Sequence, residues 1–270
     1  MRASQGWLLT AICAVVLGMA VSGCGTASMV LPSDTAGTAL FEQAQTFLAD
    51  GKNRQAAGAF ETLLRNYPTS PHLAEARIGQ GRAYYEQNRN DRLLLAVNAF
   101  RNFLTYHPSH AQVDYAQLMI AMSFTRLMRS ADRDQSQTRA ALQAYQDFHE
   151  DYPDSRYRDL AENNMREVVD TLAQHEIQVA MFQLGRGRYD ATRQRAHYAL
   201  RNYPQTSFRC DLINLLAESH WREGDARQAG DYYQRLVDEH PDCDYAGDAR
   251  KRLNTGGAVG SLNGDDPGIR

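Results

Sequence analysis

A short pattern of small, aromatic and proline positions recurs five times along the chain. Each copy ends with an aromatic residue or histidine followed by proline, at Pro68, Pro108, Pro153, Pro204 and Pro241. In four copies a small residue stands twelve positions before the proline and an aromatic residue eight positions before it. The pairs are Ala56 and Phe60, Ala96 and Phe100, Ala141 and Tyr145, and Ala229 and Tyr233, while the copy at Pro204 is degenerate, with Thr192 and Ala196. Residues four apart share one face of a helix, so the spacing predicts helices.

The same positions indicate how pairs of helices would pack. A small side chain lets two antiparallel helices approach closely, the aromatic one turn later fills the groove, and proline ends the helix because it cannot donate the next hydrogen bond. Ser70, Ser155 and Thr206, two residues past their prolines, are expected to cap the following helices, and Pro71 suits a first helical position. These offsets resemble the second half of a tetratricopeptide repeat (TPR). We predict an all-α fold, a right-handed superhelical α-solenoid of about five TPR-like helix pairs over residues 38–254.

The prolines lie further apart than the ~34 residues of an ideal repeat, and two segments explain the difference. Residues 130–136 are predicted to be a polar loop. Residues 156–184 contain neither proline nor glycine and predict one helix of roughly 40 Å. A solenoid of this kind has a concave groove that holds a peptide or a domain. Because consecutive helical residues diverge by ~100°, one of Tyr84 and Tyr85 is expected to line that groove.

The N-terminal segment has the layout of a secretory signal peptide. Arg2 precedes an apolar run from Trp7 to Val21 that is too short to span a membrane. Residues 21–24 resemble the bacterial lipobox, which predicts a signal peptide over 1–23 and a lipid on Cys24. The alternative is an ordinary signal peptide cut near Gly23. Residues 24–37 are predicted to form a lipidated tether and residues 255–270 a disordered tail.

Net charge limits the classes of partner, and the cysteines raise the question of a disulfide. The formal charge is −3, and no later segment has ~20 consecutive apolar residues, so we expect no nucleic-acid partner and membrane contact through the lipid anchor alone. Export permits a disulfide between Cys210 and Cys243. The sequence leaves open whether these residues form a bridge or stay as two half-buried thiols.

The motifs of catalysis are missing. His175-Glu176 lacks the second histidine of a zinc-protease helix, and His107, although spaced from His110 like a metal ligand, occupies the aromatic position of its repeat. No phosphate-binding loop, nucleophile elbow or C-x-x-C pair is present. We therefore expect a binding protein with no cofactor and no metal, and not an enzyme.

Arginines are concentrated in one stretch of the chain, between two acidic stretches. Two interpretations are open: pairing with acidic residues of adjacent repeats, or a protein-binding surface, for which arginine is well suited because it binds carboxylates through two parallel hydrogen bonds. The residues are Arg186, Arg188, Arg193, Arg195, Arg201 and Arg209, with Asp190 as the acidic residue among them.

The chain resembles the BamD family, lipoproteins of the outer-membrane β-barrel assembly machinery. Gln194, where the family usually has Asn, Arg188, where a small residue is common, and a short insertion in the third repeat depart from the family pattern. The phrases that carry the resemblance are Tyr67-Pro-Thr-Ser-Pro71, Ala83-Tyr-Tyr85, Val113-Asp-Tyr-Ala116, Asp132-Arg-Asp134, Arg139-Ala-Ala141, His175-Glu-Ile-Gln-Val-Ala180, Arg186-Gly-Arg-Tyr189 and Arg195-Ala196.

The resemblance implies a lipoprotein on the periplasmic face of the outer membrane. It implies binding to the periplasmic domains of the barrel protein BamA, association with other Bam lipoproteins, and reception of unfolded outer-membrane barrel proteins. The residues implied for contact with BamA are Arg186, Tyr189 and Arg195. Those implied for the substrate groove are Tyr84, Tyr85 and Tyr115.

Two alternatives stay open. One is another TPR scaffold of the envelope, such as the Tol-Pal coordinator or a pilus-assembly lipoprotein, although no coiled-coil segment stands between Cys24 and the first repeat as the coordinator would require. The other is an exported enzyme on a helical scaffold, which would need a convergent set of catalytic residues.

Overall fold

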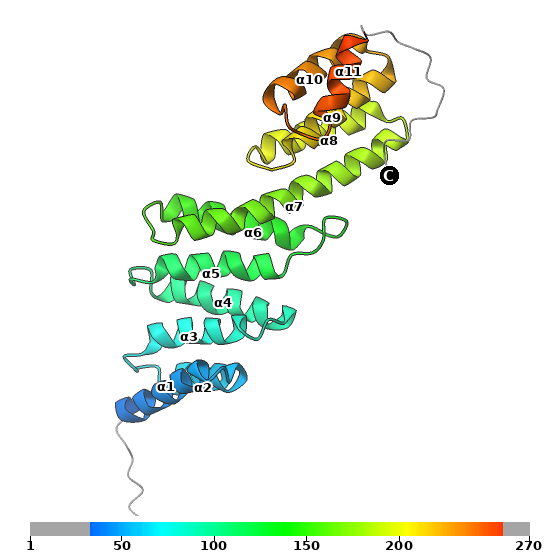
Figure 1. Cartoon of the computed structure of the whole chain (residues 1–270). Helices are drawn as coiled ribbons and strands as arrows, with labels where there is room; N and C mark the ends of the chain where they lie inside the picture. Colours follow the sequence, from blue (N-terminus) through cyan, green and yellow to red (C-terminus); the bar gives the residue numbers. More distant parts are fainter. Residues whose placement is uncertain (1–32, 256–270) are drawn as a thin grey trace, which may run out of the picture.

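The described part of the chain is a stack of antiparallel helix pairs. The computed structural model describes residues 33–255, and these contain helices and no strand (Figure 1). Five pairs follow one another, and a single helix, α11, closes the C-terminal end. The predicted all-α, TPR-like solenoid is confirmed. The helices are α1 Ser33–Ala49, α2 Asn53–Asn66, α3 Leu73–Tyr85, α4 Asn90–Tyr106, α5 Val113–Arg126, α6 Ser136–Asp151, α7 Arg158–Gly185, α8 Tyr189–Asn202, α9 Arg209–Glu223, α10 Ala226–Glu239 and α11 Ala246–Asn254.

The recurring aromatic–proline phrase forms the turn between one pair and the next. In all five copies the carbonyl before the proline accepts the N–H three residues on, as from Ser70 to Tyr67 at 3.0 Å. The Oγ atoms of Ser70, Ser155 and Thr206 accept the N–H two residues on, at 3.3, 3.1 and 3.2 Å. That N–H belongs to the residue just before the helix, and α3 begins at Leu73, two residues beyond Pro71. The three side chains therefore stabilise the turn that leads into each helix. We expected them to cap N–H groups of the helix itself, and that prediction was wrong.

A different turn joins the two helices within a pair. Gly51, Gly187 and Gly224 adopt positive φ angles of 71°, 69° and 94°, and Asn88 has φ 47°. At Gly224 the N–H groups of residues 224 and 225 bond to the carbonyls of Trp221 and His220, the pattern that ends many helices with glycine. Each of these glycines precedes the proline of its own repeat by the same number of positions. This signal was not part of our sequence prediction. In the third pair the polar loop takes this place, as predicted.

The small and aromatic positions of the repeat form the core. Phe60, Phe100 and Tyr145 are fully buried, and so are the small residues four positions before them. Phe60 and Phe100 pack on the backbone of α3, where a Cβ added to Gly79 or Gly81 would lie 2.4 or 2.7 Å from the nearest ring atom. Glycine is therefore required at both positions, because side chains in well-packed cores have no spare volume.

The long helix α7 joins the two halves of the stack. It was predicted over residues 156–184 and spans Arg158–Gly185, 28 residues or about 42 Å. One part of α7 packs on α5 and α6, and another part on α8 and α9 (Figure 1). One continuous apolar core, which extends from Ile78 on α3 to Leu216 on α9, runs through this helix.

The ends of the solenoid differ from the predicted boundaries. Helix α1 begins at Ser33, inside the segment 24–37 that we predicted to be a tether, so the part of that segment from residue 33 onward is helical. The predicted signal peptide, Cys24, and all but the first residue of the predicted tail lie outside the described residues. Within residues 33–255, none of the helices combines the length and the apolarity needed to cross a bilayer.

Candidate protein-binding surface

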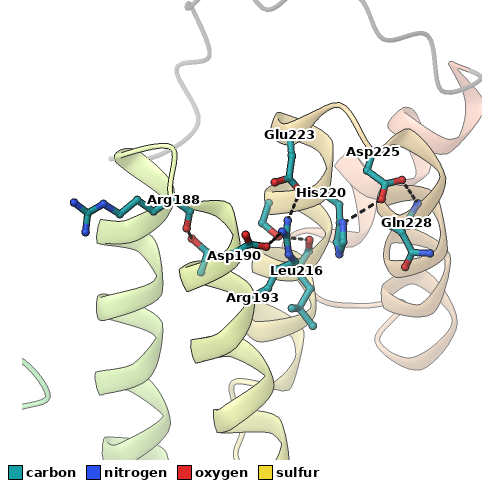
Figure 2. Close-up of polar contacts among 10 residues, drawn as sticks. Arg188, Asp190, Arg193, Leu216, His220, Glu223, Asp225 and Gln228 are labelled. Atoms are coloured by element: carbon teal, nitrogen blue, oxygen red, sulfur yellow. Dashed lines mark hydrogen bonds and ion pairs between the residues drawn. The ribbon is translucent and has the colours of Figure 1, made fainter.

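Arg193 and Arg209 of the arginine cluster are paired with acidic residues of neighbouring helices. Arg193 on α8 bonds Asp190 and, at 2.6 Å, Glu223 on α9, and its side chain is only 14% exposed (Figure 2). Arg209 lies 3.9 Å from Glu239. Burial acts to lower the pKa of Arg193, but the hydrogen bonds with Glu223 and Asp190 outweigh it and raise that pKa. For Arg193 and Arg209 the intramolecular interpretation is correct.

The arginines at the turn between α7 and α8 have a different environment. Arg186 and Arg188 are exposed, and within residues 33–255 no carboxylate lies within 4 Å of either guanidinium. The guanidinium of Arg186 lies 4.8 Å from the ring centre of Phe182, and Phe182 is itself 59% exposed. Figure 2 shows the side chain of Arg188 pointing away from the Arg193 network. This turn therefore presents cations beside an uncovered aromatic ring.

Arg195 combines both situations. Its Nη1 donates to Oε2 of Glu176 on α7 at 3.1 Å, yet half of its side chain is exposed. Tyr189, the third residue predicted to bind a partner, lies at the start of α8 and packs partly buried against the main core. The α7–α8 pair thus carries all three predicted residues, with Arg186 and Arg195 accessible and Tyr189 largely structural.

The tyrosines predicted to line a substrate groove are more enclosed than expected. Tyr85 is 5% exposed, because the guanidinium of Arg126 covers its ring at 3.6 Å and donates to its carbonyl. This burial corrects the assignment of Tyr85 to the groove. Tyr84 is partly exposed, and Tyr115 is partly buried between Phe100 and Tyr157. Burial raises the pKa of Tyr84 and of Tyr115 above the ordinary tyrosine value.

A cleft between the second and third helix pairs was not predicted. It has a volume of about 490 Å³ and lies between α4, α5 and α6. Ile120 and Phe124 of α5 are among its apolar lining residues, with Arg101 and Asp147 on the flanking helices. Helical periodicity places residues on a face of one helix but does not say which faces of three helices leave a gap, so the cleft could not be predicted from the sequence.

A closed polar network joins the last helices. Glu218 on α9 accepts hydrogen bonds from the Tyr233 hydroxyl at 2.7 Å and from Arg222 at 3.4 Å, and Arg252 of α11 lies 3.0 Å away. Burial and the charge of Glu218 together raise the pKa of Tyr233. Cys210 at the start of α9 and Cys243 before α11 are joined by a disulfide, with Cα atoms 6.6 Å apart. Both contacts fasten α11 to the stack.

Histidines and acidic residues do not gather into a metal site. Among the described residues, no group of three or more His, Cys, Asp or Glu side chains is arranged to hold a metal ion. His107, which we assigned to the repeat, lies against Phe103, while His175 bonds the carbonyl of Ala131 at 2.6 Å. These histidines have structural neighbours that explain their positions.

The fold and this surface define a class: a helical-repeat scaffold whose accessible features suit contact with another protein. Residues 33–230 match the model of the YfiO family, described as outer membrane lipoprotein, and the chain belongs to that family. The predicted resemblance is confirmed.

Curated relatives agree with the family match. The outer membrane protein assembly factor BamD of Neisseria meningitidis is 28% identical over 242 residues, which cover 84% of this chain and 90% of the relative. BamD of Xylella fastidiosa is 29% identical over 213 residues, 75% of this chain and 72% of the relative. A solved thermophilic TPR protein of Thermus thermophilus is 16% identical and covers 81% of this chain and 97% of its own, with a TM-score of 0.34, too low to add to the argument from the helices.

Proposed function

We propose that this protein is a non-catalytic scaffold for the assembly of outer-membrane β-barrel proteins, held by a lipid on Cys24 at the periplasmic face of the outer membrane. The family description and the names of the relatives support the outer-membrane assembly role. The lipobox-like residues 21–24 support the anchor. The family match favours this proposal over the Tol-Pal coordinator and the pilus-assembly lipoproteins.

The proposed partner surface is the α7–α8 pair, and its partner is the set of periplasmic domains of BamA. The observation that carries this proposal is that Arg195 and Arg186 stay accessible although neighbouring arginines are paired. Arginine binds carboxylates through parallel hydrogen bonds and stacks on aromatic rings, which makes it common in interface centres. Arg195, Arg186 and the exposed ring of Phe182 would provide such anchors, while other Bam lipoproteins would bind elsewhere on the stack.

The proposed site for unfolded barrel proteins lies in the N-terminal repeats. Tyr84 and Tyr115 offer partly exposed rings there, and the cleft between α4, α5 and α6 offers an apolar lining beside Arg101 and Asp147. An extended chain needs apolar pockets for alternate side chains and polar groups for its backbone. The cleft contains both kinds of group.

The experiment is a pull-down of the acylated protein from membranes, with BamA as the expected companion. Arg186→Glu should lose much of the recovered BamA while the melting temperature and helical content stay close to wild type, because Arg186 is exposed and no carboxylate of residues 33–255 lies within 4 Å of its guanidinium. Arg227→Glu on α10 is the matched control, since Arg227 is also exposed. Equal losses in both variants, or wild-type recovery with Arg186→Glu, would contradict the proposed surface.

A further inference from the structure

One charged residue lies in the interior of the described chain. Glu176 is 6% exposed and is the sole ionisable acid or base, cysteine and tyrosine aside, among the buried residues of the part that the structure describes. Glutamate is almost never so deeply buried unless it is paired. Its partner is Arg195, whose Nη1 lies 3.1 Å from Oε2.

Core packing alone does not require a carboxylate at this position. Removing a carboxylate from water is costly, and replacing a buried ion pair by apolar residues of similar volume is often neutral or stabilising. The neighbours on α7 follow the apolar rule: Ala173, Ile177 and Ala180 are all buried. A charge at residue 176 is therefore explained by what it does to the arginine and not by the packing of α7.

The pair is asymmetric, with one end inside and one end outside. The side chain of Glu176 is 8% exposed, while that of Arg195 is 50% exposed. The guanidinium is a planar fork with five N–H donors, and its hydrogen bond to Glu176 uses Nη1 alone. The buried carboxylate thus fixes one corner of the fork, and other donors stay available at the surface.

The helix that carries Glu176 is itself fastened. His175, the residue before it, bonds the carbonyl of Ala131 in the loop of the third pair at 2.6 Å. On the other side of the pair, the Thr192 hydroxyl on α8 bonds the carbonyl of Ala180 on α7 at 3.3 Å. Because both helices are held, the position of Oε2 is fixed relative to the surface.

We propose that Glu176 is a positioning residue that holds the guanidinium of Arg195 ready for a carboxylate on an acidic segment of the partner protein. This inference rests on the proposed function, in which Arg195 contacts the partner. A free arginine side chain loses rotamer freedom when it binds, and an arginine that is already held does not lose it again. Glu176 therefore strengthens binding without touching the partner.

The test is a double-mutant cycle measured by titration calorimetry with purified BamA periplasmic domains. Glu176→Gln keeps the shape and removes the charge, and it should weaken binding ~3–10-fold, the effect of freeing one long side chain. Arg195→Ala should weaken it at least about tenfold. The double variant should bind no more weakly than Arg195→Ala, because Glu176 acts through that residue. A further loss in the double variant would indicate a general structural effect and would overturn the inference.

The other outcomes separate this inference from the proposed function. If Arg195→Ala weakens binding and Glu176→Gln leaves it unchanged or tighter, the positioning role is wrong and the proposed surface stands. If Arg195→Ala binds as wild type, the proposed contact itself fails. Should Glu176→Gln not fold, Glu176→Met offers an apolar side chain of similar length for the same cycle. If neither variant folds, Glu176 is a structural residue and the inference is overturned.

Discussion

Two carboxylates bind arginines in contrasting ways. One lies on α7 and the other on α9, the first helices of two successive helix pairs. Glu218 on α9 is surrounded by Tyr233, Arg222 and Arg252, and the two arginine side chains are 27% and 26% exposed. Glu176 on α7 is more deeply buried but bonds one arginine that is half exposed. Carboxylate–arginine pairing thus holds the C-terminal end of the stack together at Glu218, whereas at Glu176 it leaves arginine donors at the surface.

The difference follows from the presence of α11. That helix brings Arg252 over the last pair, where its guanidinium also lies 5.0 Å from the ring centre of Trp221. A solenoid needs such a cap, because the final repeat has no following neighbour to cover its apolar face. Among residues 33–255, no comparable helix covers the α7–α8 turn and the adjoining part of α8, so Arg186, Phe182 and Arg195 are exposed.

The largest expected effect is on stability at the closed site. Glu218→Ala removes the acceptor of three donors and leaves two arginines close together, so the free energy of unfolding should fall by about 3 kcal/mol. Glu176→Gln, which keeps a hydrogen-bonding group, should cost clearly less. Urea unfolding followed by circular dichroism measures both. Equal losses in the two variants would remove the distinction between a closed site and an open one.

The disulfide should reinforce the closed end to a smaller extent. Cys210 and Cys243 are 33 positions apart, and breaking the bridge with Cys243→Ser should lower the free energy of unfolding by about 2 kcal/mol, because the unfolded chain regains the freedom of that loop. A count of free thiols at residues 210 and 243 in the unreduced mature protein checks the bridge directly. Two free thiols would show that the closed end relies on the Glu218 network alone.

The smallest effect is expected from the histidine between the two sites. His220 stacks on Tyr232, and its Nδ1 lies 3.6 Å from Asp225, the N-cap of α10 (Figure 2). Burial and the charge of Arg193 lower the pKa of His220, while Asp225 and Glu223 oppose this shift. The unfolded chain therefore binds a proton first as pH falls through the usual range near 6.5, and folding stability decreases below that range.

His220→Gln should flatten this dependence. The melting temperature of the wild type is expected to be lower at pH 5.5 than at pH 7.5, and the variant should show a smaller difference. The pKa values of His197 and His107 are lowered too, so the variant should keep part of the dependence of the melting temperature on pH. A slope of the same size with and without His220 would assign the pH dependence to those residues.

The repeat architecture could be predicted because its determinants are local. The aromatic–proline turns and the spacing of Ala56 and Phe60 act within one helix or one turn, and the absence of proline and glycine from 156–184 sufficed to predict α7. The glycines at 51, 187 and 224 carried an equally local signal that was overlooked. The candidate site was harder to predict from the sequence: Arg186 and Arg195 are exposed, and their role in partner binding stays a prediction, whereas Tyr85 is buried.

The amino-acid sequence by itself determined the helical repeat, the turns at its prolines, which faces are apolar and which family pattern the chain follows. The tertiary structure alone decided which arginines are paired, that Glu176 is buried beneath Arg195, that Arg252 reaches Glu218, and where a cleft opens between α4 and α6. The reason is distance along the chain. Helix signals act over a few residues, whereas burial and ion pairing depend on groups that meet only after the helices have stacked.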